Sequence, residues 1–163
     1  MEQADWISIV VLAAVLLAVY GWLRRRTVTA PPRKATRQIA IDGTNVLFWR
    51  DEVAQLQTLR VVVDHLRYQG IDPVIFLDAS SRHHIGDKSL DEQKFARALG
   101  VPQKRVMVCP ARTEADAFIL QYAGEHKLPV VSNDRFRDRP REARNIRLIR
   151  GRFNGDRLIL KGL

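Results

Sequence analysis

Residues 73–78 read PVIFLD, a continuous apolar run that ends in an aspartate. Such a run, without alternation of polar and apolar residues, is typical of a strand buried on both faces of a parallel sheet. A shorter apolar run with the same ending, QIAID, lies at residues 38–42. Both runs predict buried strands that carry an aspartate at the carboxyl end.

Strand and helix patterns alternate along the rest of the chain after residue 37. Gly70 and Gly100 are placed to end two helices, Thr113 to cap a third, and Asn154-Gly155 is a hairpin turn signal. This order predicts an α/β domain with a mostly parallel sheet and helices on both faces. We expect helices at residues 52–69, 89–99 and 113–127, strands at residues 38–41, 73–77, 105–109, 128–131 and 146–149, and a hairpin over residues 153–160.

The chain of 163 residues has a formal net charge of +9, which favours a polyanionic partner, either nucleic acid or an acidic lipid surface. The basic excess is unevenly placed, because residues 24–37 carry six basic side chains and no acid. With Pro31-Pro32 and no apolar periodicity, this stretch is predicted to be a linker before a domain at residues 38–163. The single cysteine, Cys109, excludes an intrachain disulfide and a cysteine-rich zinc site.

Residues 6–23 contain no charged side chain, and as a helix they would be about 27 Å long, close to the ~30 Å hydrocarbon core of a bilayer. Arginines follow at residues 24–26, whereas the only charged side chains at residues 1–5 are the acids Glu2 and Asp5. We therefore expect a single-pass membrane anchor that leaves the N-terminus outside and the domain at residues 38–163 in the cytoplasm. A cleaved signal peptide fits less well because the positive charge follows the apolar run, and a buried soluble helix because the run has no polar face.

Acidic side chains follow the predicted strands or open the helix between them, at Asp42, Asp78, Glu114, Asp116, Asp134 and Asp138. In parallel-sheet folds the carboxyl ends of the strands meet at one edge, so we expect these carboxylates to converge. Carboxylates brought together repel one another, and a divalent cation such as Mg²⁺ or Mn²⁺ removes the conflict. Each acid taken alone also fits a turn or helix-start role. Whether Asp78 or Glu114 joins the site stays open.

Three stretches resemble the NYN/PIN-like ribonucleases: IDGTNVLF at residues 41–48, EADAFILQYA at 114–123 and VVSNDRFRD at 130–138. They are most similar to the nuclease domain of the CCCH zinc-finger mRNA-degrading proteins of the Regnase or MCPIP type. The stretch RFNGDRLIL at residues 152–160 resembles the closing hairpin of that domain. The resemblance covers about residues 38–160 and implies a three-layer α/β/α, PIN-like (Rossmann-like) domain that cleaves RNA endonucleolytically at an acidic Mg²⁺ site.

Carried over motif by motif, the resemblance implies catalytic and metal-binding roles for Asp42, Asp116, Asp134 and Asp138, with Asn45 completing the loop after the first strand. Two departures from the family stand out. The family has two adjacent acids where this chain has Ala115-Asp116, and a chain with one cysteine contains no CCCH zinc finger. The target selection that the finger provides is therefore not implied for this chain.

Hydrolysis by a metal-activated water predicts 5′-phosphate and 3′-hydroxyl products. Phe136 is expected either to stack on a base or to lie in the core, and His83 and His84, in a polar loop, to be solvated or to face RNA. We expect RNA and, through residues 6–23, membrane lipid as partners, and a homo-oligomer stays open. No small-molecule cofactor is expected, because no phosphate-cradling glycine-rich loop is present. The candidates to hold flanking phosphates are Arg82, Arg135, Arg137 and Arg139.

Two other functions fit part of the sequence. DGT after a strand also belongs to the DxDGT signature of haloacid-dehalogenase-type phosphatases, but Ala40 stands where that chemistry needs a nucleophilic aspartate. A membrane-tethered PIN-like module that binds RNA without cleaving it is supported by Ala115. Cleavage of RNA with added metal would separate this module from the enzyme.

Overall fold

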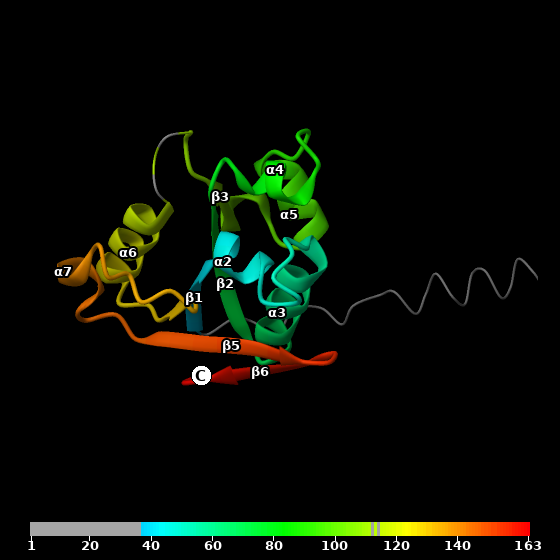
Figure 1. The fold of residues 1–163 in the computed structure, drawn as a ribbon. Coiled ribbons are helices and arrows are strands. Elements are labelled where there is room, and N and C mark those ends of the chain that lie inside the picture. Colours follow the sequence, from blue (N-terminus) through cyan, green and yellow to red (C-terminus); the bar gives the residue numbers. More distant parts are fainter. Residues whose placement is uncertain (1–36, 112, 114) are drawn as a thin grey trace, which may run out of the picture. The chain divides into compact units, whose positions relative to one another are not determined.

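Strand β1 (Arg37–Asp42) lies at the centre of a six-stranded sheet, in which all neighbours are parallel except the last pair. In the computed structural model, which describes residues 37–111, 113 and 115–163, the strands follow the order β3-β2-β1-β4-β5-β6 (Figure 1). The prediction of an α/β domain with a mostly parallel sheet is confirmed. The remaining strands are β2 (Ile71–Leu77), β3 (Val106–Val108), β4 (Val130–Val131), β5 (Leu148–Asn154) and β6 (Arg157–Lys161).

Residues 1–36 lie outside the described residues. They include the predicted anchor at residues 6–23 and all of the predicted linker except Arg37, which is the first residue of β1. Within the part of the chain that the structure describes, no helix is long and apolar enough to cross a membrane.

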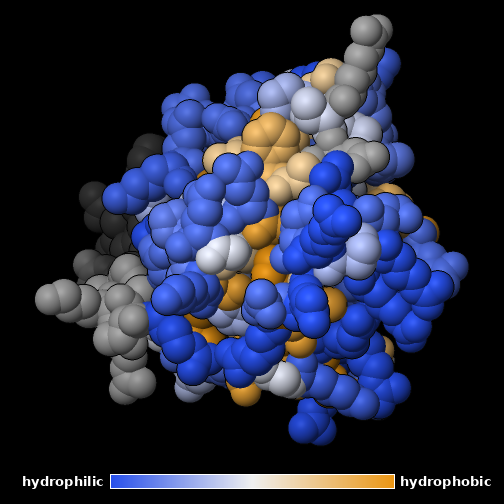
Figure 2. Space-filling view, turned by 90° about the vertical axis from the view of Figure 1, so that its left-hand side faces the viewer, coloured by the Kyte–Doolittle hydropathy of each residue, from blue (hydrophilic) through white to orange (hydrophobic). Residues whose placement is uncertain are grey.

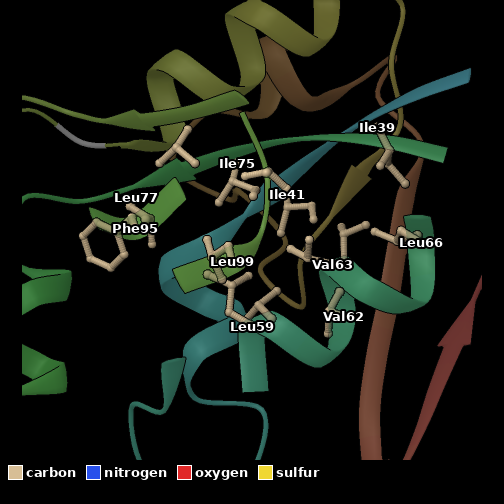
Figure 3. Close-up of a cluster of buried hydrophobic side chains, with 14 of the residues drawn as sticks. Ile39, Ile41, Leu59, Val62, Val63, Leu66, Ile75, Leu77, Phe95 and Leu99 are labelled. Carbon is tan, nitrogen blue, oxygen red and sulfur yellow. The ribbon is translucent and has the colours of Figure 1, made fainter. Parts of the chain in front are cut away.

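Helices cover both faces of the sheet, with α3 and α5 on one side and α6 on the other (Figure 1). Alternate residues of the central strands serve the two faces, as the pleat of a strand requires. Ile39 and Ile41 pack in the cluster with α3 and α5, whereas Ala40 packs in the cluster with α6 (Figure 3). The helices are α2 (Gly43–Leu47), α3 (Leu56–Tyr68), α4 (Ser81–Ile85), α5 (Glu92–Leu99), α6 (Ala115–His126) and α7 (Pro140–Ala143).

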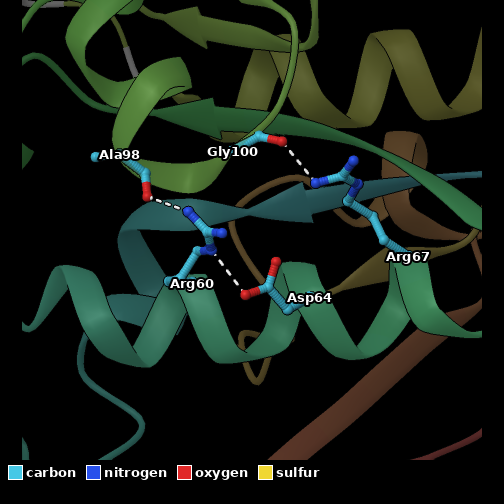
Figure 4. A network of polar contacts seen from close by, with 5 residues as sticks. All are labelled: Arg60, Asp64, Arg67, Ala98 and Gly100. Carbon is cyan, nitrogen blue, oxygen red and sulfur yellow. Dashed lines mark hydrogen bonds and ion pairs between the residues drawn. The ribbon is translucent and has the colours of Figure 1, made fainter. Parts of the chain in front are cut away.

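Two arginines of α3 fasten it to the C-terminal end of α5 (Figure 4). Arg60 donates to the carbonyl of Ala98 over 2.6 Å and to Asp64 over 2.7 Å, and Arg67 donates to the carbonyl of Gly100. These carbonyls belong to the last turn and the cap of α5, where backbone acceptors have no partner inside the helix. The two helices on this face therefore share polar contacts as well as the apolar core.

Two predicted helices begin later than the sequence indicated, and one predicted loop is a helix. The helix predicted over residues 52–69 begins at Leu56, because Asp51 and Glu52 adopt positive φ angles of 56° and 54° that no α-helix contains, and Val53 is 57 % exposed. The helix predicted from residue 89 begins at Glu92, since Asp91 caps it by accepting the N–H of Lys94. The predicted polar loop that holds His83 and His84 is the short helix α4.

The predicted C-terminal hairpin is confirmed, but its first strand is longer than the sequence indicated. β5 continues from Leu148 to Asn154, and β6 pairs with it antiparallel, from Asn154 opposite Arg157 back to Arg150 opposite Lys161. Gly151 permits this continuation, because a Cβ at that position would lie 2.0 Å from the ring of Trp49. The absence of a side chain at Gly151 therefore lets β5 pack directly against Trp49, which follows α2.

Candidate active site

The carboxyl end of β1 lies at the point where the strand order reverses. β2 follows β1 in the chain on one side, and β4 lies on the other side. In open parallel sheets this reversal opens a crevice at the strand ends, where ligands bind. Asp42, the last residue of β1, is at this point, only 6 % exposed.

Asp42 is held by hydrogen bonds to both of its carboxylate oxygens. Its Oδ1 accepts the backbone N–H of Asn45 over 3.0 Å and so caps α2, and its Oδ2 accepts the hydroxyl of Ser132 over 2.7 Å. Gly43 lets the chain turn here against β2, since a Cβ would lie 2.8 Å from the carbonyl oxygen of Phe76. The carboxylate is therefore fixed by residues of two strand ends.

The pKa of Asp42 is raised to about 6, first because burial disfavours the charged form and then because Asp116 and Asp78 add negative charge. The hydrogen bonds from Asn45 and Ser132 act in the opposite direction. Repulsion among the carboxylates shows that Asp42, Asp78 and Asp116 lie in one electrostatic environment. Asp78 and Asp116 are thus near enough to Asp42 to raise the pKa of its carboxyl.

Asp78 connects β2 to the start of α6. Its Oδ1 accepts the N–H of Ala115, the first residue of α6, over 3.0 Å. Its own N–H donates to the hydroxyl of Thr44 over 2.8 Å, and that hydroxyl also contacts the Ser81 hydroxyl at 3.0 Å. Asp78 therefore both carries charge at the site and holds α6 against the strand ends, a connection that the sequence left open.

Asn45 joins α2 to the segment after β4. Its Oδ1 accepts the indole N–H of Trp49 over 2.8 Å and the backbone N–H of Asn133 over 3.0 Å. Asn133 in turn pairs with the backbone of Gly151, donating from Nδ2 to the carbonyl and accepting the N–H at Oδ1. The side-chain amide of Asn133 thus pairs with the backbone of β5 just beyond the end of the short strand β4. The sequence analysis missed this role.

The segment after β4 carries Asp134 and Asp138. The hydroxyl of Ser132, which donates to Asp42, also accepts the N–H of Asp134. The carboxylate of Asp134 in turn accepts the N–H of Phe136 over 2.9 Å. Phe136 has a φ angle of 48°, which is uncommon for an aromatic residue, and its side chain is only 3 % exposed. Of the two roles considered for Phe136, the structure supports the one in the core.

A cavity of about 240 Å³ brings four carboxylates together. It is lined by Asp78, Asp116, Asp134 and Asp138 together with Ala115, Phe136, Arg137 and Arg139, whereas Asp42 is not among the residues that line it. Carboxylate oxygens are the ligands that hard divalent cations prefer, so the chemistry of this donor set fits Mg²⁺ or Mn²⁺. In the described part of the chain, which excludes Glu114, no three His, Cys, Asp or Glu side chains stand close enough together to hold a metal ion as they are arranged.

The four arginines predicted to bind RNA lie in different surroundings. Arg137 and Arg139 line the acidic cavity, and Arg139 also lies 3.9 Å from Glu142. Arg82 lines an adjoining cavity of about 290 Å³ that shares Asp78, and its buried Nε has no hydrogen-bond partner among the described residues. Arg135 is exposed beside Asp134. The face of the molecule on the α6 side is mostly hydrophilic, with a narrow apolar strip between hydrophilic flanks (Figure 2).

Cys109 is a buried neighbour of the acids that the sequence did not connect with them. It follows β3, and its N–H donates to the carbonyl of Leu77 over 2.8 Å. Burial, with added charge from Asp78 and Asp116, raises the pKa of its thiol to about 11. The thiol is therefore protonated at neutral pH and unsuited to act as a nucleophile or a metal ligand.

Comparison with known proteins gives results of two kinds. The sequence model of the Zc3h12a-like ribonuclease NYN domain matches residues 35–161. Two solved structures of the nuclear protein-only RNase P 2 of Arabidopsis thaliana have TM-scores of 0.56 and 0.58, at 17 % and 16 % sequence identity. The matches cover 97 % and 98 % of this chain but only 35 % and 36 % of those proteins, and identity this low concerns the fold alone. None of the curated proteins compared with the chain matches it.

Proposed function

Because the chain belongs to the family of Zc3h12a-like ribonuclease NYN domains, we propose that it is an endoribonuclease that hydrolyses RNA phosphodiester bonds with a divalent metal ion. The observation that carries the proposal is the burial of Asp42 at the reversal of the strand order, near a cavity lined by four further carboxylates. A bound Mg²⁺ or Mn²⁺ would relieve the repulsion among these acids, and it would supply the chemistry for activating water and for neutralising charge on the scissile phosphate. The products carry a 5′-phosphate and a 3′-hydroxyl.

The acids have distinct parts in this proposal. Asp42, Asp116, Asp134 and Asp138 would hold the metal ion. Asp78 is added because it lines the same cavity as Asp116, Asp134 and Asp138. Asn45 positions the segment after β4 through its bond to the N–H of Asn133. The arginines proposed to contact phosphates on either side of the cleaved bond are Arg82, Arg135, Arg137 and Arg139.

We further propose that residues 6–23 anchor the enzyme in a membrane, with the catalytic domain in the cytoplasm. The support is the uncharged run of 18 residues followed at once by Arg24, Arg25 and Arg26. Extraction of membranes with alkaline carbonate should leave the full chain in the pellet, whereas deletion of residues 1–23 should release it. Recovery of the full chain in the supernatant would refute a spanning anchor.

A second candidate function is an RNA-binding module without catalysis. It is favoured by Ala115, which stands where the family has a further acid, and by the absence of a preformed group of three metal ligands among the described residues. RNA binding that persists while cleavage is absent at every metal concentration would identify the module.

A circular RNA tests the proposed activity, because only an endonuclease can open a circle. The full chain should linearise it with Mg²⁺ or Mn²⁺ and leave it intact with EDTA. Asp42→Asn should reduce the rate by at least about a hundredfold, since it removes the carboxylate at the reversal of the strand order that is proposed to hold the metal ion. Asp51→Asn, at an exposed aspartate, is the matched control and should cleave normally. Near-normal turnover by Asp42→Asn would refute the assignment of the site.

A further inference from the structure

A groove of about 720 Å³ lies where β1 and β2 begin, at the opposite ends of these strands from the candidate active site. The end of α3 and strand β6 bound it, two elements that lie on the lower side of the molecule in Figure 1. Arg37, His65 and Arg157 line it together with apolar residues such as Leu158 and Leu163. Among the described residues that line the groove, none is an aspartate or a glutamate. The groove therefore suits a ligand that is both anionic and partly apolar.

Tyr68 stands beside this groove. It is the last residue of α3 and is 88 % exposed, an unusual exposure for a large aromatic side chain. On a helix, residues three apart are neighbours, so Tyr68 adjoins His65, which lines the groove. Tyrosine is one of the two residues enriched at membrane–water interfaces, where its ring is partly buried and its hydroxyl is hydrated.

The position at which the chain enters the domain supplies the second argument. β1 begins at Arg37, which lines the groove, so the basic stretch at residues 24–36 joins the domain there. Thirteen residues, 24–36, separate the proposed anchor from Arg37, and a chain of this length spans at most about 45 Å. An anchor at residues 6–23 would therefore keep Arg37, and the groove that it lines, within reach of the lipid headgroups.

We propose that the groove and Tyr68 dock the domain on an anionic phospholipid surface, the leaflet beside the anchor. The proposal rests on the anchoring part of the proposed function. Arg37 and Arg157 meet the phosphates of the lipid headgroups, and Tyr68 and Leu163 lie at the edge of the acyl chains. Docking by the amino ends of the strands leaves the acidic cavity, at the carboxyl ends, directed away from the bilayer and open to RNA.

The test uses the full chain, reconstituted in vesicles of phosphatidylcholine alone or of phosphatidylcholine with phosphatidylserine. Amide hydrogen exchange reports docking segment by segment. We expect added protection of residues 68–71 and 157–161 in the anionic vesicles and none in the neutral ones. Basic side chains near an anionic membrane each contribute roughly fivefold in affinity. Arg37→Gln with Arg157→Gln should therefore lower the ratio of docked to undocked domain by about 25-fold.

Arg97→Gln with Lys104→Gln is the matched control, because it removes the same charge from exposed positions outside the groove and should keep the protection. Equal protection in both kinds of vesicle, or none in either, overturns the proposal. So does a groove variant that stays docked but binds RNA more weakly, since the groove would then belong to RNA. A chain that alkaline washing removes from vesicles overturns anchor and docking together, whereas a retained but unprotected chain refutes docking alone. Ribonuclease activity in detergent is measured separately.

Discussion

At the residue scale, opposing electrostatic effects act on the carboxyl group of Asp42. It is nearly inaccessible, accepts two hydrogen bonds and is surrounded by further carboxylates. Hydrogen bonds lower its pKa, but burial and charge outweigh them, so the pKa is raised to about 6 in the metal-free protein. Burial stabilises the protonated form of this carboxyl, whereas metal binding requires the ionised form. A bound cation would stabilise the ionised form by its own charge.

This conflict predicts how metal-free stability depends on pH. The folded protein holds the Asp42 proton more tightly than the unfolded chain does, because the pKa is raised from 3.8 to about 6. Stability present below pH 3.8 is therefore lost as the pH rises through about 6, by about 3 kcal/mol at most. Asp42→Asn does not titrate, so in EDTA at pH 7.5 it should be more stable than the parent protein, and at pH 4 similar to it.

Urea denaturation in EDTA at the two pH values measures this difference, with Asp51→Asn as the control at an exposed site. Addition of Mg²⁺ should stabilise the parent protein and leave Asp42→Asn nearly unchanged. An Asp42→Asn protein that is less stable than its parent in EDTA at pH 7.5 would mean that the bonds to Asn45 and Ser132 outweigh the repulsion.

At the scale of elements, Asp78 links strand β2 to helix α6 through one hydrogen bond to the first N–H of the helix. Two substitutions separate this structural contact from the charge. Asp78→Asn keeps an acceptor for Ala115 and should leave thermal stability nearly unchanged, while it weakens metal binding. Asp78→Ala removes the acceptor as well, and should cost about 1 kcal/mol, the usual loss for a helix-capping side chain.

Calorimetric titration with Mn²⁺ and thermal unfolding of the two variants provide the measurements. Equal metal affinity in Asp78→Asn and the parent protein would restrict Asp78 to the capping role. Equal stability of Asp78→Asn and Asp78→Ala would show instead that α6 does not depend on this bond.

The strands were predictable from the sequence because their signal is strong over a few residues. PVIFL and QIAI are continuous apolar runs, and a buried parallel strand needs little else. The short helices α2, α4 and α7 were not predictable, since five, five and four residues are too few to show a helical period. Residues 150–152 of β5 were missed because Arg150 and Arg152 flank Gly151, and the need for a glycine there follows only from the contact with Trp49.

The acids of the site could be predicted in part for the same reason. Asp42 and Asp134 follow buried strands, and strand ends of a parallel sheet share an edge. Asn133 could not be found in this way, because its contacts depend on the alignment of the segment after β4 with β5. The double role of Asp78 likewise depends on where α6 begins, which no spacing in the sequence reveals.

At the scale of the whole molecule, positive charge beside the acidic cavity governs how a polyanion is held. Arg137 and Arg139 line the cavity, and an exposed pair such as Arg139–Glu142 at 3.9 Å competes weakly with a phosphate. Each phosphate contact with single-stranded RNA adds roughly 0.7 to the slope of log affinity against log salt. In a cleavage-deficient Asp42→Asn background, Arg137→Gln with Arg139→Gln should reduce this slope by about 1.4.

The reduction should be similar for RNAs of different sequence, because contacts with phosphates do not read bases. Arg97→Gln with Lys104→Gln, in the same background, removes equal charge away from the cavity and should keep the slope. Parallel lines for the cavity pair and the parent protein would show that these two arginines do not contact the substrate. Arg82 and Arg135 would then be the next to examine.

Two of the hydrogen bonds that fix Asp42 and Asn45 can form only late in the synthesis of the domain. Asp42 and Ser132 are 90 residues apart in the chain, and Asn45 and Asn133 are 88 apart. A nascent chain that ends after β3 already contains Asp42 and Asn45, but it lacks the hydroxyl of Ser132 and the N–H of Asn133 that set their geometry. The loop between β1 and β4 has to close before these contacts form. During synthesis beside its own messenger RNA, the chain therefore completes the surroundings of Asp42 only after Ser132 and Asn133 have been added.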